Sequence, residues 1–388
     1  MKLAVVSYKV CRSSPDEPGV FRTDGGFPLQ IGAISELFDE TRVVVPCERM
    51  KNENGLSPLS GRNLSVAPLS VPKGEDFRRK LNMPFWLLKN GWIIWREVRR
   101  ADAVHAPIPG DIGTIGMLFA LILRKPLFVR HCGNWLIPRT AAEHFWRWSM
   151  ERFAGGRNVM LATGGNDEAP SAKNPHIKWI FSTSLRGDQL SRAAPRELPA
   201  DGKLKLIAAC RQEETKGTDI VIKSLPSVLE KFPAATLDVV GDGSFMESLK
   251  KTAEELNLRE KVFFHGRVEQ PKVVGLMRKA HVFCFPTSAS EGFPKVVVEA
   301  LASGLPVITT RISVLPQLIK KDFGVLLDAP TAENLAAAVS EICADAEKYR
   351  RMSESAIAAA QCYSLENWRD LIGETLRRSW RVASLSSA

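Results

Sequence analysis

Short apolar runs alternate along the whole chain with amphipathic stretches of helical length. The apolar runs predict strands near residues 2–7, 42–46, 103–106, 126–131 and 158–162, and again at 204–209, 236–241, 262–265, 282–285, 306–309 and 324–327. Amphipathic stretches at 28–38, 111–123 and 141–153 predict helices between the early strands. Such alternation is typical of an α/β protein whose parallel sheets are covered by helices on both faces.

The chain length predicts two domains. At 388 residues the chain is longer than one hydrophobic core usually supports. The segment 191–203, with Pro195, Pro199 and Gly202, is the best linker. Because open parallel sheets bind ligands outside the carboxyl ends of their strands, two such domains predict a cleft between them.

Composition excludes several classes of protein. Hydrophobic residues make up 45% of the chain and charged residues 25%, as in ordinary globular proteins. The longest apolar run, 112–123, is shorter than the roughly 20 residues that span a bilayer. The seven cysteines are scattered and form no C-x-x-C pair, which favours reduced thiols. The first residues predict a buried strand rather than a signal peptide, so we expect a cytoplasmic location.

The net charge of +10 is concentrated in one stretch. Residues 71–100 hold eight basic and three acidic side chains, interleaved with aromatic residues from Phe85 to Trp95. Amphipathic helices of this composition lie on anionic membrane surfaces. The alternative is a helix of the first domain whose aromatic residues face the core. Nucleic-acid binding is disfavoured, because no recognition motif accompanies the charge.

The segment 285–308 carries the most informative pattern. A strand ends at Phe285, Pro294 suits the first turn of a helix, and Gly304 suits its left-handed end. This places Glu291 and Gly292 in the loop before the helix. Backbone N–H groups and the helix dipole favour an anion there, and a glycine allows close approach of the ligand.

Glu291 and Glu299 can accept hydrogen bonds from sugar hydroxyls, as acidic residues do with ribose in dinucleotide-binding folds. A hydrolase acid–base pair is an alternative. On one helix, however, eight residues would separate the two by about 12 Å, beyond the roughly 5–9.5 Å of glycosidases. A helix-capping acid with a solvated surface glutamate is a further alternative.

Arg211 and Lys216 follow the first strand of the second half. A planar guanidinium fork and a compact ammonium are complementary ways of holding phosphates, and both lower the barrier when a nucleoside diphosphate leaves. Gly241-Asp242-Gly243 predicts only a tight turn, and His265 a packing or hydrogen-bonding residue.

The two glutamates with seven residues between them, followed by Ala300-Leu301-Ala302-Ser303-Gly304-Leu305-Pro306-Val307-Ile308, resemble the signature of family-four retaining glycosyltransferases. This resemblance implies the GT-B fold, with two facing Rossmann-like doubly wound domains and a cleft. It covers 204–363 well and the first domain loosely. We expect an acceptor-binding domain at 1–190, the linker at 191–203, a nucleotide-sugar-binding domain at 204–363, and a final segment, 364–388, that crosses back to the first domain.

The resemblance also implies residue roles. Glu291, His131, Arg211 and Lys216 are expected at the catalytic centre. Expected donor contacts are Gly25, Gly26, Arg211, Lys216, Arg267, Val268, Glu291, Gly292, Phe293, Lys295, Val296 and Glu299. No cofactor and no bound metal are expected. Pro294 stands where the family commonly has glycine, and Phe181-Ser182-Thr183-Ser184-Leu185 stands where many relatives have Asn-Gly-Val-Asp.

The implied activity is transfer of a sugar, with retention, from a UDP- or GDP-sugar to a glycan or lipid-linked acceptor in cell-surface polysaccharide or lipopolysaccharide biosynthesis. Peripheral attachment to the inner face of the plasma membrane through residues 71–100 would suit such an acceptor. Two alternatives are a UDP-sugar epimerase of the same architecture and a non-catalytic carbohydrate- or membrane-binding protein.

Overall fold

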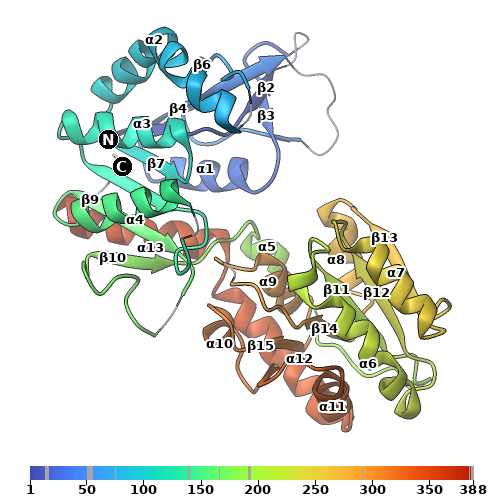
Figure 1. The fold of residues 1–388 in the computed structure, drawn as a ribbon. Coiled ribbons are helices and arrows are strands. Elements are labelled where there is room, and N and C mark those ends of the chain that lie inside the picture. Colours follow the sequence, from blue (N-terminus) through green and yellow to red (C-terminus); the bar gives the residue numbers. More distant parts are fainter. Residues whose placement is uncertain are drawn as a thin grey trace. The chain divides into compact units, whose positions relative to one another are not determined.

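The chain folds into two compact units (Figure 1). The computed structural model describes residues 1–13, 17–49, 56–74, 76–138, 140–165, 167–190, 194–290, 292–383 and 385. Unit 1 comprises Met1–Gly164, Glu168–Ser184 and Leu365–Ala388, and unit 2 comprises Gly165–Asp167 and Leu185–Ser364. Of the expected linker, 191–193 lie outside the described residues and 194–203 belong to unit 2.

Unit 1 is built on a sheet with the strand order β10-β9-β8-β7-β1-β4-β2-β3-β5, with β6 also paired to β4. Its strands are β1 (Lys2–Val6), β2 (Cys11–Ser13), β3 (Phe21–Thr23), β4 (Glu40–Arg49), β5 (Ser57–Pro58), β6 (Leu64–Leu69), β7 (Ala103–Ile108), β8 (Leu127–His131), β9 (Asn158–Thr163) and β10 (Ile177–Ile180). The pairs β2–β3 and β3–β5 are antiparallel, and the other pairs are parallel.

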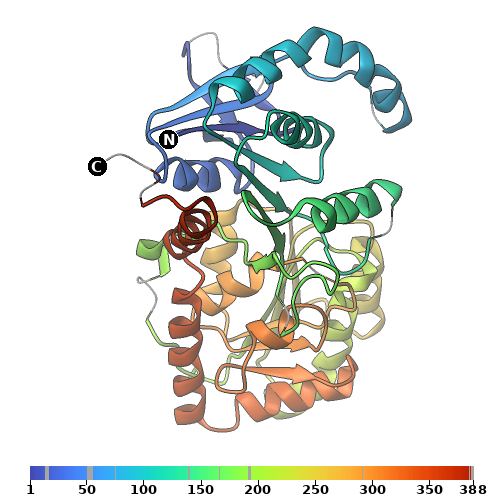
Figure 2. The ribbon, with the colours of Figure 1, turned by 90° about the vertical axis from the view of Figure 1, so that its left-hand side faces the viewer.

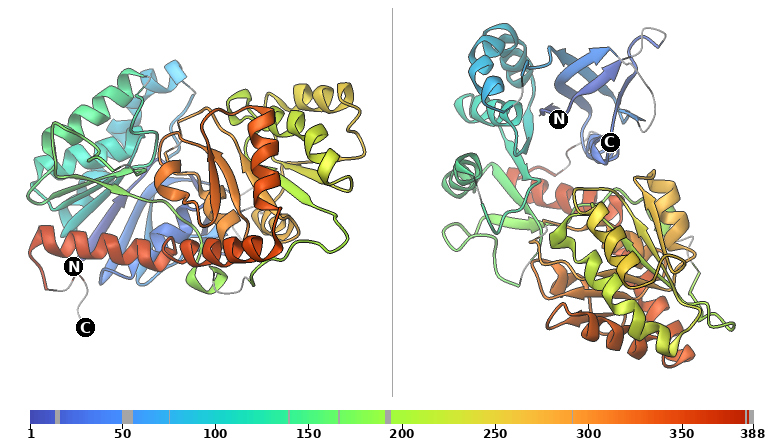
Figure 3. Two further views of the ribbon diagram at one scale, coloured as in Figure 1. Left: turned by 90° about the horizontal axis from the view of Figure 1, so that it is seen from below. Right: turned by 45° about the vertical axis from the view of Figure 1, so that its right-hand side comes forward.

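Helices cover both faces of this sheet, because successive strand residues point to opposite sides. Its helices are α1 (Phe27–Ser35), α2 (Asp76–Arg100), α3 (Asp111–Ile122), α4 (Ala141–Phe153) and α13 (Leu365–Trp380). Val5 packs into the core that contains residues of α1 and α13, whereas Val6 packs into the core that contains residues of α2 and α3. Figure 2 shows α13 beside α1, and the left view of Figure 3 shows the strands between α13 and the α2–α3 layer.

The end of the chain belongs to unit 1 through α13. Trp368 is fully buried, with the guanidinium carbon of Arg130 4.9 Å from its ring centroid. The indole N–H of Trp380 donates to the carbonyl of Arg157 at 2.9 Å. These contacts fix the last helix to the sheet of the first unit.

Unit 2 has a fully parallel sheet with the order β13-β12-β11-β14-β15-β16. Its strands are β11 (Lys205–Ala209), β12 (Thr236–Val240), β13 (Val262–Gly266), β14 (Val282–Phe285), β15 (Val307–Thr310) and β16 (Gly324–Leu327). Its helices are α5 (Gly187–Leu190), the 3-10 turn η1 (Glu214–Lys216), α6 (Thr218–Lys231), α7 (Met246–Glu255), α8 (Gln270–Met277), α9 (Lys295–Ala302), α10 (Leu315–Leu318), α11 (Ala332–Ile342) and α12 (Ala346–Gln361). The strand order reverses between β11 and β14, where doubly wound sheets bind ligands.

The predicted strands and helices are confirmed, with ends shifted by a few residues. Gly304 has the predicted left-handed conformation, with φ +72°. Pro294 differs from its prediction: it precedes the first turn, as the N-cap of α9, because its ψ of 90° is extended and the helix begins at Lys295. Within the part of the chain that the structure describes, no helix is both long enough and apolar enough to cross a bilayer.

Candidate functional site

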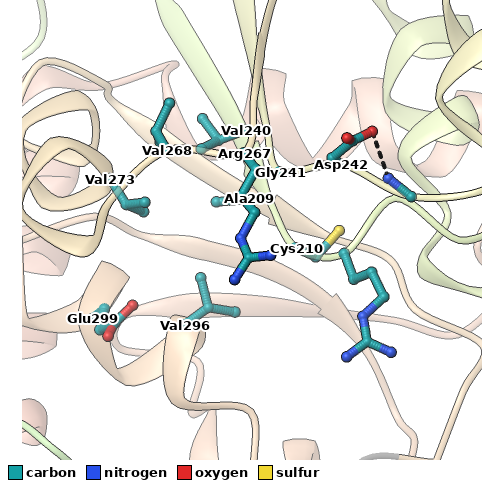
Figure 4. Close-up of a pocket in the computed structure, with 12 residues that line it drawn as sticks. Ala209, Cys210, Val240, Gly241, Asp242, Arg267, Val268, Val273, Val296 and Glu299 are labelled. Atoms are coloured by element: carbon teal, nitrogen blue, oxygen red, sulfur yellow. Dashed lines mark hydrogen bonds between the residues drawn. The ribbon is translucent and has the colours of Figure 1, made fainter. Parts of the chain in front are cut away.

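A pocket of about 630 Å³ opens at the carboxyl ends of the strands of unit 2. Its walls come from the loops after β11, β12 and β13 and from α8 and α9, and they comprise Ala209, Cys210, Arg211, Val240, Gly241, Asp242, Gly243, Arg267, Val268, Val273, Val296 and Glu299. In Figure 4, Val296 and Glu299 lie on one side of the pocket, and Val240, Gly241 and Val268 on the other. A volume of this size is in the range of small-molecule sites.

A second pocket, of about 390 Å³, shares Cys210, Arg211 and Val296 with the first. Its other residues are Glu213, Lys216, Phe285, Phe293, Pro294 and Lys295. The pocket is therefore lined by three cationic side chains and by one carboxylate, that of Glu213. The cations are Arg211, Lys216 and Lys295, and the N-terminus of α9 lies beside them. Arg211 is largely exposed, and its Nη1 lies 3.2 Å from the carboxylate of Glu213. Cations at a helix N-terminus favour a multiply charged anion such as a diphosphate.

The loops after β11 and β14 are joined, which fixes the position of Lys216. The backbone N–H of Ser288 donates to the carbonyl of Thr215 at 2.8 Å. Gly217 has φ +71°, and a Cβ there would lie 2.4 Å from the carbonyl oxygen of Pro286. A larger residue would therefore separate the two loops.

Gln212 connects the loops after β11 and β12, although sequence reasoning did not find it. Its side chain is fully buried; its Nε2 donates to the carbonyls of Val240 at 2.9 Å and Cys210 at 3.2 Å. Its Oε1 accepts the hydroxyl proton of Thr218 at 2.8 Å. These bonds hold Cys210 and Gln212, the residues on either side of Arg211, against the end of β12.

Gly241-Asp242-Gly243 was expected to be a turn without chemistry, but it lines the larger pocket. A Cβ on Gly241 would lie 1.9 Å from the carbonyl oxygen of Cys210, and one on Gly243 would lie 2.3 Å from that of Gln212. The glycines are needed because two loops touch through their backbones. Paired glycines directly after a strand were the available signal.

Glu299 lies on α9 and is half-buried in the wall of the larger pocket. Its Oε1 accepts a hydrogen bond from Nε2 of Gln270 at 2.8 Å. Burial raises the pKa of Glu299, while Gln270 and Lys295 act in the opposite direction. Its expected partner Glu291 lies outside the described residues. Gly292 directly follows it and precedes α9.

Arg267 and Val268 follow β13 and line the larger pocket; their contact with the donor stays a prediction. The backbone before them is shaped by a bulge at His265, where the register with β12 shifts. Nε2 of His265 lies 2.7 Å from the buried carboxylate of Asp238, which confirms the predicted hydrogen-bonding role of His265.

The remaining predicted residues, Gly25, Gly26 and His131, belong to unit 1. Gly25 has φ +72°, and Gly26 is the N-cap of α1. His131 ends β8 and is buried, and burial lowers its pKa to about 4, so its imidazole is neutral at neutral pH. Among the described residues, no hydrogen-bond partner is present for its Nδ1.

Metal ligands do not gather in the part of the chain that the structure describes: no group of three or more His, Cys, Asp or Glu side chains is placed to hold an ion.

Comparisons with known proteins agree with this arrangement. Residues 192–359 match the family model of Glycosyl transferases group 1. The chain is 26% identical over 209 residues to the GDP-mannose-dependent alpha-(1-6)-phosphatidylinositol monomannoside mannosyltransferase of Mycolicibacterium smegmatis, covering 52% of this chain and 54% of that protein. It is 29% identical over 195 residues to the poly(glycerol-phosphate) alpha-glucosyltransferase of Bacillus subtilis, covering 49% of this chain and 28% of that protein.

The fold extends the similarity to the whole chain. The crystal structure of Anabaena HepE in complex with UDP superposes with a TM-score of 0.68 at 18% identity, covering 97% of this chain and all of that one. The matched regions span about half, or less, of the length of these curated relatives. Residues 192–359 are thus similar to the glycosyl transferases group 1 family, and the chain as a whole has the GT-B fold.

Proposed function

We propose that this protein is a retaining glycosyltransferase that takes a sugar from a UDP- or GDP-sugar. The observation that carries the proposal is the convergence of Arg211, Lys216 and Lys295 at the N-terminus of α9, next to the larger pocket with Glu299. One relative is named for its use of GDP-mannose, and HepE was crystallised with UDP, which supports a nucleotide-sugar donor.

The proposed chemistry breaks the bond between the anomeric carbon and the diphosphate oxygen. The acceptor oxygen forms the new bond to that carbon, and its proton passes to the departing diphosphate. Negative charge develops on the departing diphosphate. Arg211, Lys216 and Lys295 stabilise that charge together with the N-terminal end of α9. Since these cations supply the charge that a metal ion would otherwise provide, the proposed reaction needs no bound metal and no cofactor.

The nucleoside of the donor is expected in the larger pocket. Glu299 accepts hydrogen bonds from donor hydroxyls in its ionised form, and the same role is proposed for Glu291. The backbone of Arg267 and Val268 contacts the nucleobase. In unit 1, the neutral imidazole of His131 offers a hydrogen bond to the transferred sugar, and the turn at Gly25 and Gly26 allows close approach of substrate.

The proposed acceptor is a glycan or lipid-linked molecule used in cell-surface polysaccharide or lipopolysaccharide synthesis at the cytoplasmic side of the membrane. Helix α2 supports a membrane location. Phe85 is 73% exposed, Leu88 83% and Trp92 66%, whereas Trp86 and Ile94 are buried. The alternative in which the aromatic residues of this stretch face the core is therefore wrong for Phe85 and Trp92.

The test measures UDP and GDP binding to the whole chain by calorimetry. Arg211→Ala and Lys216→Ala are each expected to weaken binding about tenfold or more, since each removes a charge-assisted hydrogen bond. Lys250→Ala is the matched control, because Lys250 pairs with Glu247 on the surface of α7. Equal affinities in all three variants, or no binding of either nucleotide, would overturn the proposal.

Product analysis separates the alternatives. Incubation with UDP-glucose or GDP-mannose and an acceptor should release the nucleoside diphosphate and give a product with retained anomeric configuration by NMR. Isomerised donor without an acceptor would instead identify an epimerase. Nucleotide binding without any turnover would identify a binding protein.

A further inference from the structure

Unit 1 has a charged pocket at the opposite end of its sheet from His131. The pocket has a volume of about 390 Å³ and lies where β1 and β4 begin and α2 ends. It is lined by Lys2, Leu3, Glu40, Arg42, Arg96, Glu97, Arg100 and Ala101. We propose that this pocket binds the phosphate of an anionic lipid headgroup.

A buried carboxylate organises the pocket. Glu97 is 7% exposed, and its Oε1 accepts from Nε of Arg96 at 3.0 Å and from Nη2 at 2.7 Å. Its Oε2 lies 3.6 Å from Nε of Arg42. One carboxylate thus holds two guanidinium groups, and each keeps further N–H donors. Planar guanidinium forks of this kind match phosphate oxygens.

The balance of charge favours an anion. Among the residues that the structure describes, Arg100 has no ion-pair partner, while Lys2 pairs with Glu40 at 3.0 Å. Nζ of Lys125 donates to the carbonyls of Arg99 at 2.9 Å and Ala101 at 2.6 Å, which offsets the negative end of the α2 dipole. When Lys125 and Asp102, which lie beside the pocket, are included, cationic side chains outnumber carboxylates by five to three. The cations are Lys2, Arg42, Arg96, Arg100 and Lys125, and the carboxylates are Glu40, Glu97 and Asp102.

The surface that continues from the pocket identifies the source of the phosphate. Leu81, Phe85, Leu88 and Trp92 are 58%, 73%, 83% and 66% exposed, and their spacing of four, three and four residues places them on one line of α2. Arg96 follows four residues after Trp92 and so continues this line into the pocket. The neighbouring α3 adds exposed Leu118 and Ile122. Exposed apolar side chains beside a phosphate-binding site are typical of a protein surface that binds anionic lipids.

This inference deepens the proposed function by naming its membrane partner, but it does not depend on the donor pocket. The experiment measures binding of the whole chain to vesicles of phosphatidylcholine alone and to vesicles that also contain phosphatidylglycerol. We expect binding to the second kind only. Arg96→Gln combined with Arg100→Gln should weaken it about 30-fold, from roughly fivefold for each basic residue near the surface.

The control changes the same charge elsewhere on unit 1: Arg62→Gln combined with Lys173→Gln replaces two exposed residues outside α2. This pair should weaken vesicle binding much less. Arg100→Gln alone guards against misfolding, because it breaks no described contact, and about a fivefold loss is expected. Equal losses in the two double variants would show non-specific attraction and overturn the pocket.

Inorganic phosphate separates the two sources of the ligand. If Arg100-dependent binding of inorganic phosphate is found while the vesicles are not bound, the lipid assignment is overturned. UDP and GDP affinities should be the same in all variants. If the wild-type protein binds vesicles but neither nucleotide, the donor proposal fails and the lipid site stands.

Discussion

Replacing Gln212 by methionine, which has a similar shape, tests how the donor pocket is held together. The substitution removes three hydrogen bonds at a fully buried position, to Cys210, Val240 and Thr218. Each net hydrogen bond contributes about 1 kcal/mol, so the expected loss of unfolding free energy is about 3 kcal/mol. The carbonyl of Val240 keeps a second donor, the backbone N–H of Cys210 at 3.1 Å, which limits the loss at that atom.

The expected loss is measurable in unit 2 by itself. About 3 kcal/mol corresponds to a fall of roughly 6–12 °C in the unfolding midpoint of a unit of this size. Hydrogen exchange followed by mass spectrometry reads the peptides of 204–363 separately. All nine tryptophans lie in unit 1, so tryptophan fluorescence provides an internal control that should not change.

A double-mutant cycle with Thr218→Val tests whether the three bonds act as one network. The hydroxyl of Thr218 donates to Gln212, so the two substitutions should be less than additive by about 1 kcal/mol. UDP and GDP affinity should fall in Gln212→Met because Arg211 and Gly243 lose their support. Unchanged exchange in 204–363, or fully additive costs, would refute this account of the pocket.

Three further predictions address ionisation and packing. Burial raises the pKa of Glu299, and its ionised form is the expected acceptor of donor hydroxyls, so calorimetry should show donor affinity rising as pH increases through that pKa, with Glu299→Gln removing the dependence. The pKa of His131 falls from 6.5 to about 4, so it favours the folded state above pH 6.5 and this contribution, about 3 kcal/mol, is lost as pH falls toward 4; pH-dependent unfolding of His131→Asn should be flatter. Trp368→Ala should destabilise unit 1 by about 3–5 kcal/mol in denaturant unfolding, whereas Trp92→Ala, at an exposed site, should not.

The alternation of apolar runs and amphipathic stretches predicted the architecture, because parallel strands that are buried on both faces give continuous apolar runs. Five strands of unit 1 were missed: β2, β3 and β5, since two or three residues carry no period, and also the longer β6 and β10. Sequence spacing also predicted where Arg211, Lys216 and Glu299 lie, because each follows a strand or a helix start at the same edge of the sheet.

Other parts of the site could not be predicted, for physical reasons. The sequence does not indicate whether a glutamine in a loop is buried, so the role of Gln212 could not be predicted before its hydrogen-bond partners were known. Glycines serve both tight turns and backbone contacts, and only the distance from Gly241 to Cys210 decides between them. The exposure of Phe85 and Trp92 could not be predicted either. The same amphipathic pattern occurs in a helix whose aromatic residues face the core and in one whose aromatic residues face a partner at the surface.

Two groups of cationic residues lie in separate units, and this division makes the two proposals separable. The cations of the donor pocket are in unit 2, at the carboxyl ends of its strands, and those around Glu97 are in unit 1, at the amino ends of its strands. Each proposed ligand is held by charges that line its own pocket, and exposed charges are screened over about 10 Å at ordinary salt. Lys216→Ala should therefore leave vesicle binding intact, and Arg100→Gln should leave nucleotide affinity intact. If either variant weakened both, the two sites would have to be treated as one binding surface.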